Sequence, residues 1–304
     1  MKSPTLSDPR AEGLLLLCVL IWGANYSVSK FGISQVDPLV YNAFRYIIGA
    51  GCLLVILALG PRREPVAPGD RGPLMRAGLI ANVLNQLAFI LGLSLTSAGN
   101  AAIILATAPV LTVLMNARIS RAAVPAGVWS GSILSLIGVA TLVAGSGRDV
   151  EIGSAALVGD LLCFLAALFW AFNTNIQKPL VGKYAPTQVA AAMVGVGAIG
   201  LCLAAIPVLP SVSWERADGG FFAAAVWSGV FSIAIGNILW STGVKRLGPD
   251  RTANFGNLIP VIGFLVSLFA LGERFDILQA AGAALTIGGV WLARARSSPP
   301  WRSA

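Results

Sequence analysis

The stretch FLAALFWAFNTNIQKPLVGKYAP, residues 164–186, repeats the pattern of LLCVLIWGANYSVSKFGISQVDP, residues 16–38. At an offset of 148 residues Trp22 aligns with Trp170, and three further identities follow: Asn25 with Asn173, Lys30 with Lys178, and Pro38 with Pro186. Farther along, an offset of 151 aligns Gly92 with Gly243, Pro109 with Pro260, Gly131 with Gly282, and Gly138 with Gly289. A shift of about half the chain length predicts an internal duplication.

The composition is that of a membrane protein. Of 304 residues, 56% are hydrophobic and only 11% are charged, and the mean hydropathy is +0.80. A soluble domain carries about 25% charged residues, so a polytopic membrane protein is predicted. Histidine is absent, and the four cysteines lie inside apolar runs without paired spacing. We therefore expect no disulfide framework, no metal site and no cofactor.

Apolar runs long enough to cross a bilayer, about 20 residues each, divide the chain into ten predicted spans. They cover residues 13–31, 39–59, 74–94, 97–117, 125–145, 153–176, 186–207, 219–243, 252–271 and 275–294. The N-terminal run could be mistaken for a secretory signal, but the same pattern recurs in mid-chain, where no signal could act. It is interpreted as the first span.

Positive charge is distributed unevenly between the two sides. Sixteen of the 21 Lys and Arg residues lie in the termini and in alternate loops, four lie in the other loops, and Arg45 lies within a span. Because positively charged loops stay cytoplasmic, both termini are predicted to be cytoplasmic. The same distribution explains the net charge of +8 without a nucleic-acid partner.

Each half, residues 1–147 and residues 148–304, therefore holds five spans. An odd number of spans forces the second half to enter the membrane in the opposite orientation. Inverted repeats of this kind are typical of transporters, with the substrate site near the midplane between the halves. The predicted fold is an all-α integral membrane protein of ten transmembrane helices, arranged as two inverted five-helix repeats around a central cavity.

Amides and aromatic rings recur on single helical faces within the spans. In the first span, Trp22, Asn25, Tyr26 and Ser29 are spaced i, i+3, i+4 and i+7. The predicted substrate-binding residues are Trp22, Asn25, Tyr26, Asn82, Asn85, Gln86, Phe89, Trp170, Asn173, Asn237, Trp240, Asn254 and Asn257. Amides and rings together suit a small neutral or zwitterionic solute. The alternative for each amide is a hydrogen bond that links two neighbouring helices, worth about 0.6 kcal/mol.

Charged residues within the spans are few. The deepest carboxylate is Asp160, near the end of its span, and this absence favours facilitated movement or exchange over ion-coupled transport. Arg45 is expected to extend to the membrane surface or to bond backbone carbonyls, and the alternative is a carboxylate-binding cation. Its repeat partner is Met193.

Prolines and glycines have more structural roles. Pro109 and Pro260 lie within spans and are expected to bend them, and we interpret them as hinges for alternating access. Gly131, Gly138, Gly282, Gly288 and Gly289 are interpreted as packing positions that bring helices close together.

Two five-span halves, each opening with an apolar segment and Trp-x-x-Asn, resemble the drug/metabolite transporter superfamily in its ten-span EamA-type branch. Leu271-Gly272-Glu273 supports the resemblance, although the first half has Ile119-Ser120-Arg121 in that place. The overall character is similar to bacterial exporters of amino acids, including aromatic ones. The resemblance implies a cavity lined by helices 1, 3, 4, 6, 8 and 9, with Trp170 at the place of a substrate-contacting tryptophan. Ala106-Thr107-Ala108-Pro109 stands where aromatic residues can occur, which implies a roomier pocket.

The function predicted from these features and from the resemblance is facilitative export of amino acids and related small metabolites across a bacterial inner membrane by alternating access. Efflux of drugs or other small metabolites is the alternative within transport. A membrane enzyme is not expected, because the chain lacks histidine and a deep carboxylate set. The predicted partners are a small-molecule substrate and the lipid bilayer, with no nucleic acid, and the chain is expected to act as a monomer.

Overall fold

The computed structural model describes residues 8–61, 63–96, 98–121, 124–145, 154–271 and 277–295, and within these ranges every regular element is a helix. The α-helices are α1 (Pro9–Gln35), α2 (Pro38–Leu59), α3 (Pro68–Gly78), α4 (Asn85–Leu95), α5 (Ala98–Leu105), α6 (Ala108–Ser120), α7 (Ala126–Gly145), α8 (Ser154–Lys183), α9 (Pro186–Ala205), α10 (Gly219–Trp227), α11 (Gly236–Leu247), α12 (Pro249–Gly256), α13 (Leu258–Leu271) and α14 (Ile277–Ala295). Two π-helices, η1 (Leu79–Leu84) and η4 (Ser228–Ile235), and two 3₁₀-helices, η2 (Ile206–Ser211) and η3 (Trp214–Arg216), complete the set.

These elements join into ten helical runs, one for each predicted span. Seven of the runs in the described residues are long and apolar enough to cross a membrane, and the runs Ile103–Ile119 and Ile277–Ala293 are apolar but shorter. The chain is therefore an all-α, multi-pass membrane protein, as its composition predicted. The predicted boundary between residues 147 and 148 lies outside the described residues.

Local sequence explains where several runs begin. Pro38 and Pro186 start α2 and α9, where a missing N–H costs nothing. The Asp37 carboxylate accepts a hydrogen bond from the Leu39 amide at 2.8 Å and so caps the start of α2. Asp218 caps α10 in the same way. The proline start recurs in both halves, whereas the N-caps of α9 and α3, Ala185 and Ala67, provide no side-chain hydrogen bond.

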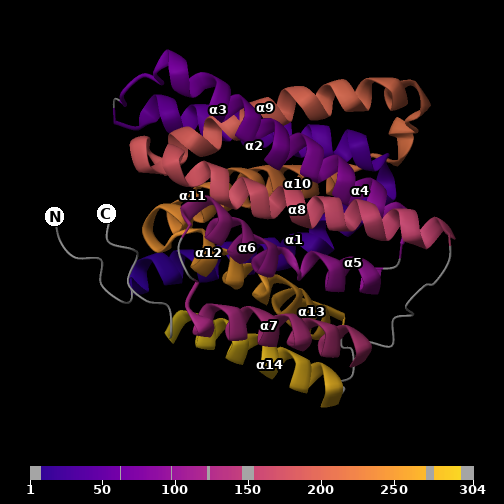
Figure 1. Ribbon diagram of the computed structural model, residues 1–304. Coiled ribbons are helices and arrows are strands. Elements are labelled where there is room, and N and C mark those ends of the chain that lie inside the picture. The colour runs from indigo at the N-terminus through magenta and orange to yellow at the C-terminus, as the bar shows by residue number, and fades with distance from the viewer. Residues whose placement is uncertain are drawn as a thin grey trace.

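The two halves enter the bundle in opposite directions. Helix α1 begins, and helix α14 ends, on the same side of the bundle, which we call the termini end (Figure 1). Helix α8, the first helix of the second half, begins on the opposite side (Figure 1). Successive runs alternate in direction across the bundle (Figure 1). With five runs in each half, this alternation gives the inverted arrangement that the odd span count predicted.

Close helix contacts are repeated between the halves with the partners exchanged. A Cβ at Gly92 would meet Cys163 Sγ at 2.8 Å, and a Cβ at Gly243 would meet Leu15 Cδ2 at 2.6 Å. Both members of one contact are the repeat partners of the other, because Gly243 follows Gly92 by 151 residues and Cys163 follows Leu15 by 148. Helices α7 and α14 pack side by side in the same symmetric manner (Figure 1), through Gly131 with Gly289 and Gly138 with Gly282. A Cβ at any of these four glycines would collide with the facing backbone. The expectation that Gly288 also brings helices together is wrong, because a Cβ there would meet nothing within 4 Å.

Each half also interrupts two of its runs at matching places. The π-helices η1 and η4 lie in the third and eighth runs, and turns at residues 106–107 and at Asn257 divide the fourth and ninth runs. π-Helical segments often mark functional sites, and divided helices are typical of transporter binding sites. The symmetric interruptions therefore direct attention to the middle of the bundle.

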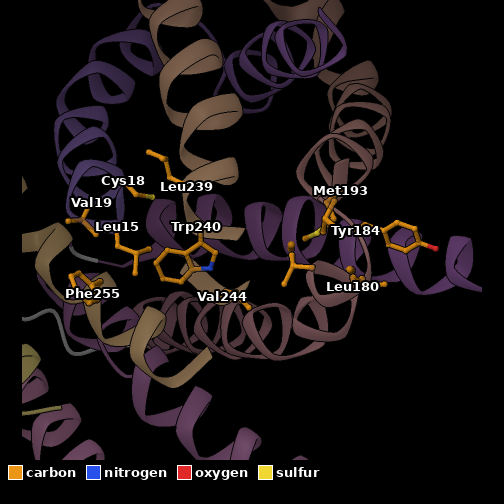
Figure 2. Close-up of a cluster of buried hydrophobic side chains, with 14 of the residues drawn as sticks. Leu15, Cys18, Val19, Leu180, Tyr184, Met193, Leu239, Trp240, Val244 and Phe255 are labelled. Atoms are coloured by element: carbon orange, nitrogen blue, oxygen red, sulfur yellow. The ribbon is translucent and has the colours of Figure 1, made fainter. Parts of the chain in front are cut away.

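A large apolar cluster fills the termini end of the bundle. It joins Leu15 and Val19 of α1 to Leu180 of α8, Met193 of α9 and Trp240 of α11 (Figure 2). Smaller apolar clusters lie near the opposite end, around Tyr41 and Phe221 and around Val40 and Ala205. The termini end is thus closed by packed side chains from both halves.

Candidate functional site

Three tryptophans contact one another within the large apolar cluster, which contains Trp240 and against which Trp22 and Trp170 pack. The ring centroids of Trp22 and Trp170 lie 5.3 Å apart, those of Trp22 and Trp240 5.2 Å, and those of Trp170 and Trp240 5.1 Å. Trp240 is almost fully buried, whereas Trp22 and Trp170 are partly exposed. The structure therefore brings together three of the predicted residues, from the first, sixth and eighth runs.

Two asparagines follow these tryptophans by three residues, about one helical turn. Asn25 lies after Trp22 on α1 and Asn173 after Trp170 on α8, and both side chains are at least 91% buried. Asn25 Nδ2 donates to Ser29 Oγ at 3.0 Å, but Asn25 Oδ1 and Asn173 Oδ1 are buried without a hydrogen-bond partner. A buried acceptor without a hydrogen bond is energetically costly, so each oxygen can accept a hydrogen bond from a bound molecule.

Four other predicted amides instead link neighbouring helices. Asn82 Oδ1 accepts from Tyr46 Oη at 3.0 Å, and Asn85 Nδ2 donates to the Ala166 carbonyl at 2.7 Å. Asn254 Oδ1 accepts from Ser132 at 2.9 Å, and Asn257 Nδ2 donates to Ser135 at 2.6 Å. These contacts match the alternative that the sequence left open, in which the amide stabilises a helix interface.

The remaining predicted residues vary in position. Gln86 and Asn237, which are repeat partners, are both partly buried, and Asn237 Nδ2 donates to the Ile233 carbonyl of its own run. Phe89 is partly buried on α4, one turn beyond Gln86. Tyr26 lies on α1, but its side chain is outside the described part of the structure.

Arg45 does not reach the membrane surface, so the expectation that it extends outward is wrong. Its side chain is only 8% exposed and lies between the η1–α4 run and η4. Nε donates to Asn42 Oδ1 at 2.7 Å, Nη1 to Ser228 Oγ at 3.3 Å and Nη2 to Gln86 Oε1 at 2.9 Å. Its partners are thus side-chain oxygens and not the backbone carbonyls that were the other expectation.

Pro109 and Pro260 do not bend continuous helices, which corrects the sequence interpretation. Pro109 is the second residue of α6 and Pro260 the third residue of α13, each just after the turn that divides its run. A proline in the first helical turn removes no intrahelical hydrogen bond. The division of each run therefore lies at the turn that precedes the proline.

Sequence reasoning missed a polar group at the termini end. Asn116 of α6 donates to Asp250 Oδ2 of α12 at 2.6 Å, and Lys178 of α8 interacts with the same carboxylate. Asp250 is the second residue of α12 and precedes the predicted ninth span, which begins at residue 252. Burial raises its pKa to about 6, although Asn116 and Lys178 both lower it. The repeated identity of Lys30 and Lys178 was the one signal in the sequence.

Two ion pairs also lie at the termini end. Lys183 Nζ lies 2.9 Å from Asp70 Oδ1, and Tyr184 Oη donates to Asp70 Oδ2 at 2.8 Å. Arg246 Nη1 lies 3.3 Å from Asp8 Oδ2. Hydrogen bonds from Lys183 and Tyr184 lower the pKa of Asp70. These contacts connect helices of the two halves and add to the closure of this end.

An all-α bundle of ten runs with inverted halves and a centre of tryptophans and amides defines a polytopic membrane transporter. The sequence matches the EamA-like transporter family twice, over residues 10–144 and over residues 157–295. The chain belongs to this family.

Several curated relatives align with this chain over nearly their whole length, and their names describe transporters. The "Uncharacterized transporter YyaM" of Bacillus subtilis is 25% identical over 91% of both chains. The "Probable amino-acid metabolite efflux pump" of Salmonella typhimurium is 25% identical, over 93% of this chain and 94% of the relative. The "Probable terminal-alkyne amino-acid exporter" of Streptantibioticus cattleyicolor is 26% identical, over 95% and 94%.

A solved structure, titled only "Crystal structure of protein", has the same fold. It superposes with a TM-score of 0.79 at 21% identity and covers 94% of this chain and 97% of its own. The family match and the relatives' names indicate a transporter.

Proposed function

We propose that this protein exports amino acids or related small metabolites across the bacterial inner membrane by alternating access. The observation that carries the proposal is the pair of buried, unpartnered oxygens, Asn25 Oδ1 and Asn173 Oδ1, beside the cluster of three tryptophans. Two acceptors can bind the ammonium group of a zwitterion, and indole rings provide apolar contact that tolerates different side chains. Names of relatives that mention amino-acid export support the same substrate class.

The packed contacts at one end of the bundle support the proposal of alternating access. The apolar cluster around Trp240 and the ion pairs of Asp70 and Asp8 close the termini end, which the distribution of positive charge predicts to be cytoplasmic. Transport then requires these contacts between the halves to separate while others form at the opposite end. The divided fourth and ninth runs supply points at which helices can rotate.

The transport is proposed to be facilitative. Within the described parts of the predicted spans, Asp160 is the one carboxylate, and it accepts a hydrogen bond from Thr96 at 2.6 Å. It lies near the end of α8 away from the termini, apart from the tryptophans. Proton- and sodium-coupled carriers commonly use a carboxylate at the substrate site, which these residues do not provide.

Reconstitution in liposomes tests the proposal. Labelled amino acids should equilibrate across membranes that contain the protein faster than across protein-free membranes, at the same final level with or without proton and sodium gradients. Accumulation above equilibrium that depends on a gradient would overturn the facilitative mechanism. Absence of amino-acid flux together with transport of a cationic dye would replace the substrate class with drugs.

A further inference from the structure

We infer that Arg45, with Gln86 beside it, is the site at which the carboxylate of the substrate binds. This inference rests on the proposed function, because it names which end of an amino acid each group recognises. Asn25 and Asn173 offer acceptors to the ammonium group, and Arg45 offers donors to the carboxylate. Arg45 and Trp22, which precedes Asn25 by one turn on α1, both donate hydrogen bonds to η4.

Arg45 is a buried cation whose contacts are all neutral. Its three hydrogen bonds go to a serine hydroxyl and two amide oxygens, and the guanidinium lies 5.9 Å and 5.8 Å from the ring centroids of Tyr41 and Tyr46. Among the described residues no carboxylate lies within ion-pair distance of it. A buried charge normally has an anionic partner, because desolvation is otherwise poorly compensated.

The residues around Arg45 carry more hydrogen-bond donors than there are acceptors near them. Asn42 Oδ1 accepts a hydrogen bond from Arg45, and Asn82 Oδ1 accepts one from Tyr46. The Nδ2 groups of both asparagines are buried without a hydrogen-bond partner. Asn42 is 2% exposed and Asn82 3%. A cation beside two unsatisfied N–H₂ groups is chemically an anion receptor, and a carboxylate is the anion an amino acid carries.

The fold itself does not require this charge. At the repeat offsets, Tyr41, Asn42, Arg45 and Tyr46 correspond to Val189, Ala190, Met193 and Val194, and Asn82 and Ser228 correspond to Ile233 and Ala77. All six counterparts are apolar and buried. The backbone packing is nevertheless equivalent. A Cβ at Gly229 would meet the Arg45 carbonyl at 2.8 Å, and a Cβ at Gly78 would meet the Met193 carbonyl at 2.9 Å.

The same architecture is thus built once with methionine and once with arginine. The residues around Met193 pack as a compact apolar cluster. Packing alone therefore does not explain why the equivalent residues around Arg45 are polar. Buried ionisable residues in membrane proteins usually mark the substrate path. The asymmetry between the halves therefore favours a ligand-binding role for Arg45 over a structural one.

Position connects Arg45 to the tryptophans. Ser228, which accepts from Arg45, and Ser232, whose carbonyl accepts from Trp22 Nε1 at 3.0 Å, lie four residues apart on η4. About one helical turn, roughly 5 Å, separates such positions along a helix. That spacing suits a molecule with its carboxylate near Arg45 and its side chain near the indoles. Gln86 is partly exposed, so a carboxylate can replace its amide oxygen on Nη2 and form the stronger charge-assisted pair.

Paired substrates test the inference. Flux of labelled L-leucine and of L-leucinamide, which lacks the carboxylate, is measured in liposomes with the wild-type protein and with Arg45→Met. This variant copies the residue of the equivalent position, so the fold can accommodate it. We expect the wild-type preference for leucine over leucinamide to fall about 10- to 100-fold, since hydrogen bonds to a charged group are lost. Met193→Leu, a volume-conserving change at the counterpart, should keep the preference.

A second variant tests the same site without removing the arginine. Gln86→Glu supplies an internal carboxylate to Nη2 and should reduce leucine flux more than leucinamide flux, so that the ratio of the two fluxes falls. An unchanged ratio of leucine to leucinamide in either folded variant would overturn the inference, whether or not absolute rates fall.

The inference can fail separately from the proposed function. Amino-acid flux with an unchanged ratio in the variants would leave export intact and reject the carboxylate site. If the wild type transports neither compound, the proposed function fails, and the melting temperature in detergent decides about Arg45. Phenylacetate, but not phenylacetamide, should then raise the melting temperature of the wild type and not that of Arg45→Met, and an equal response of both proteins would reject the site.

Discussion

Trp22 and Trp170 occupy equivalent positions in the two halves of the chain, and their rings contact each other edge to face, with centroids 5.3 Å apart and planes at 72°. A residue can touch its own repeat partner only where the two halves meet at their pseudo-symmetry axis. The axis therefore passes through the tryptophan cluster. In an inverted-repeat transporter this is also the level at which the substrate binds.

Replacing Trp170 should impair transport more than replacing a tryptophan elsewhere. Trp170→Ala removes contacts with both Trp22 and Trp240, and each aromatic pair contributes about 0.5–1.5 kcal/mol beyond area burial. We expect leucine flux to fall about tenfold or more. The measurement is initial flux in liposomes, normalised to the amount of protein inserted.

Trp129 on α7 provides the matched control. It is partly buried on the helix that packs against α14, away from the three tryptophans. Trp129→Ala should change the flux by less than about twofold, in the range of a surface substitution. Equal losses in the two variants would mean that the tryptophan cluster has no special role in transport.

Much of this arrangement could be predicted because duplication is recorded directly in the sequence. The offsets of 148 and 151 align residues whose contacts correspond in space, as for Gly92 with Cys163 and Gly243 with Leu15. The apolar runs predicted all ten helical runs, since bilayer thickness fixes their length. The three contacting tryptophans were all among the predicted site residues.

Other features depend on contacts that no local pattern encodes. Asn82 and Asn25 look alike in the sequence, yet Asn82 bonds Tyr46 across a helix interface, while Asn25 keeps a buried oxygen without a partner. The divided helix before Pro109 was expected to be a kink, because sequence shows the proline but not where the hydrogen-bond ladder stops. The bond between Asn116 and Asp250 joins residues 134 positions apart.

The contact between α7 and α14 should be sensitive to a single methyl group. A Cβ at Gly138 would collide with the backbone of Thr286, which cannot move as a flexible side chain can. We expect Gly138→Ala to lower the free energy of unfolding by about 1–3 kcal/mol, as for other overpacked sites. The change is measured as the melting temperature in detergent, with the loss of monodisperse protein as the readout.

Gly288 is the matched control for this prediction. It lies on α14 beside Gly289, but a Cβ there would meet nothing within 4 Å. Gly288→Ala should leave the melting temperature unchanged or raise it slightly, since alanine favours helix. A loss in Gly288→Ala as large as in Gly138→Ala would contradict the packing explanation.

Stability should depend on pH through Asp250. Its pKa in the folded protein, about 6, is raised above the ordinary value of 3.8 mainly by burial. A group with a raised folded pKa contributes stability below its unfolded pKa and loses it as the pH rises through the folded pKa. Between pH 4 and pH 7 this contribution should therefore decrease, by an amount on the order of 3 kcal/mol.

Comparison of variants isolates the contribution of Asp250. Asp250→Asn should flatten the dependence of the melting temperature on pH between 4 and 7, because the amide does not ionise. Asp70→Asn should act in the opposite sense. Hydrogen bonds from Lys183 and Tyr184 lower the pKa of Asp70, so its contribution is present above pH 3.8 and is lost as the pH falls through the folded pKa. A pH profile in Asp250→Asn identical to that of the wild type would exclude Asp250 as its source.

Pro109 and Pro260 should matter for the rate of transport and not for folding. Each proline follows a turn that divides its run, and it prevents the preceding turn from closing into one continuous helix, because the ring cannot donate a hydrogen bond. Replacement by alanine restores that donor and should favour a straighter, stiffer run. We expect Pro109→Ala and Pro260→Ala to slow flux severalfold, with the amount of protein in the membrane unchanged.

Pro38 and Pro186 are suitable controls, since they are also repeat partners but start α2 and α9 at positions without a division of the run. Pro38→Ala and Pro186→Ala should keep wild-type flux. The double variant of Pro109 and Pro260 should be slower than either single variant if both turns move in each cycle. Wild-type flux in that double variant would mean that the divided helices only shape the site and that the movement between the two access states occurs elsewhere.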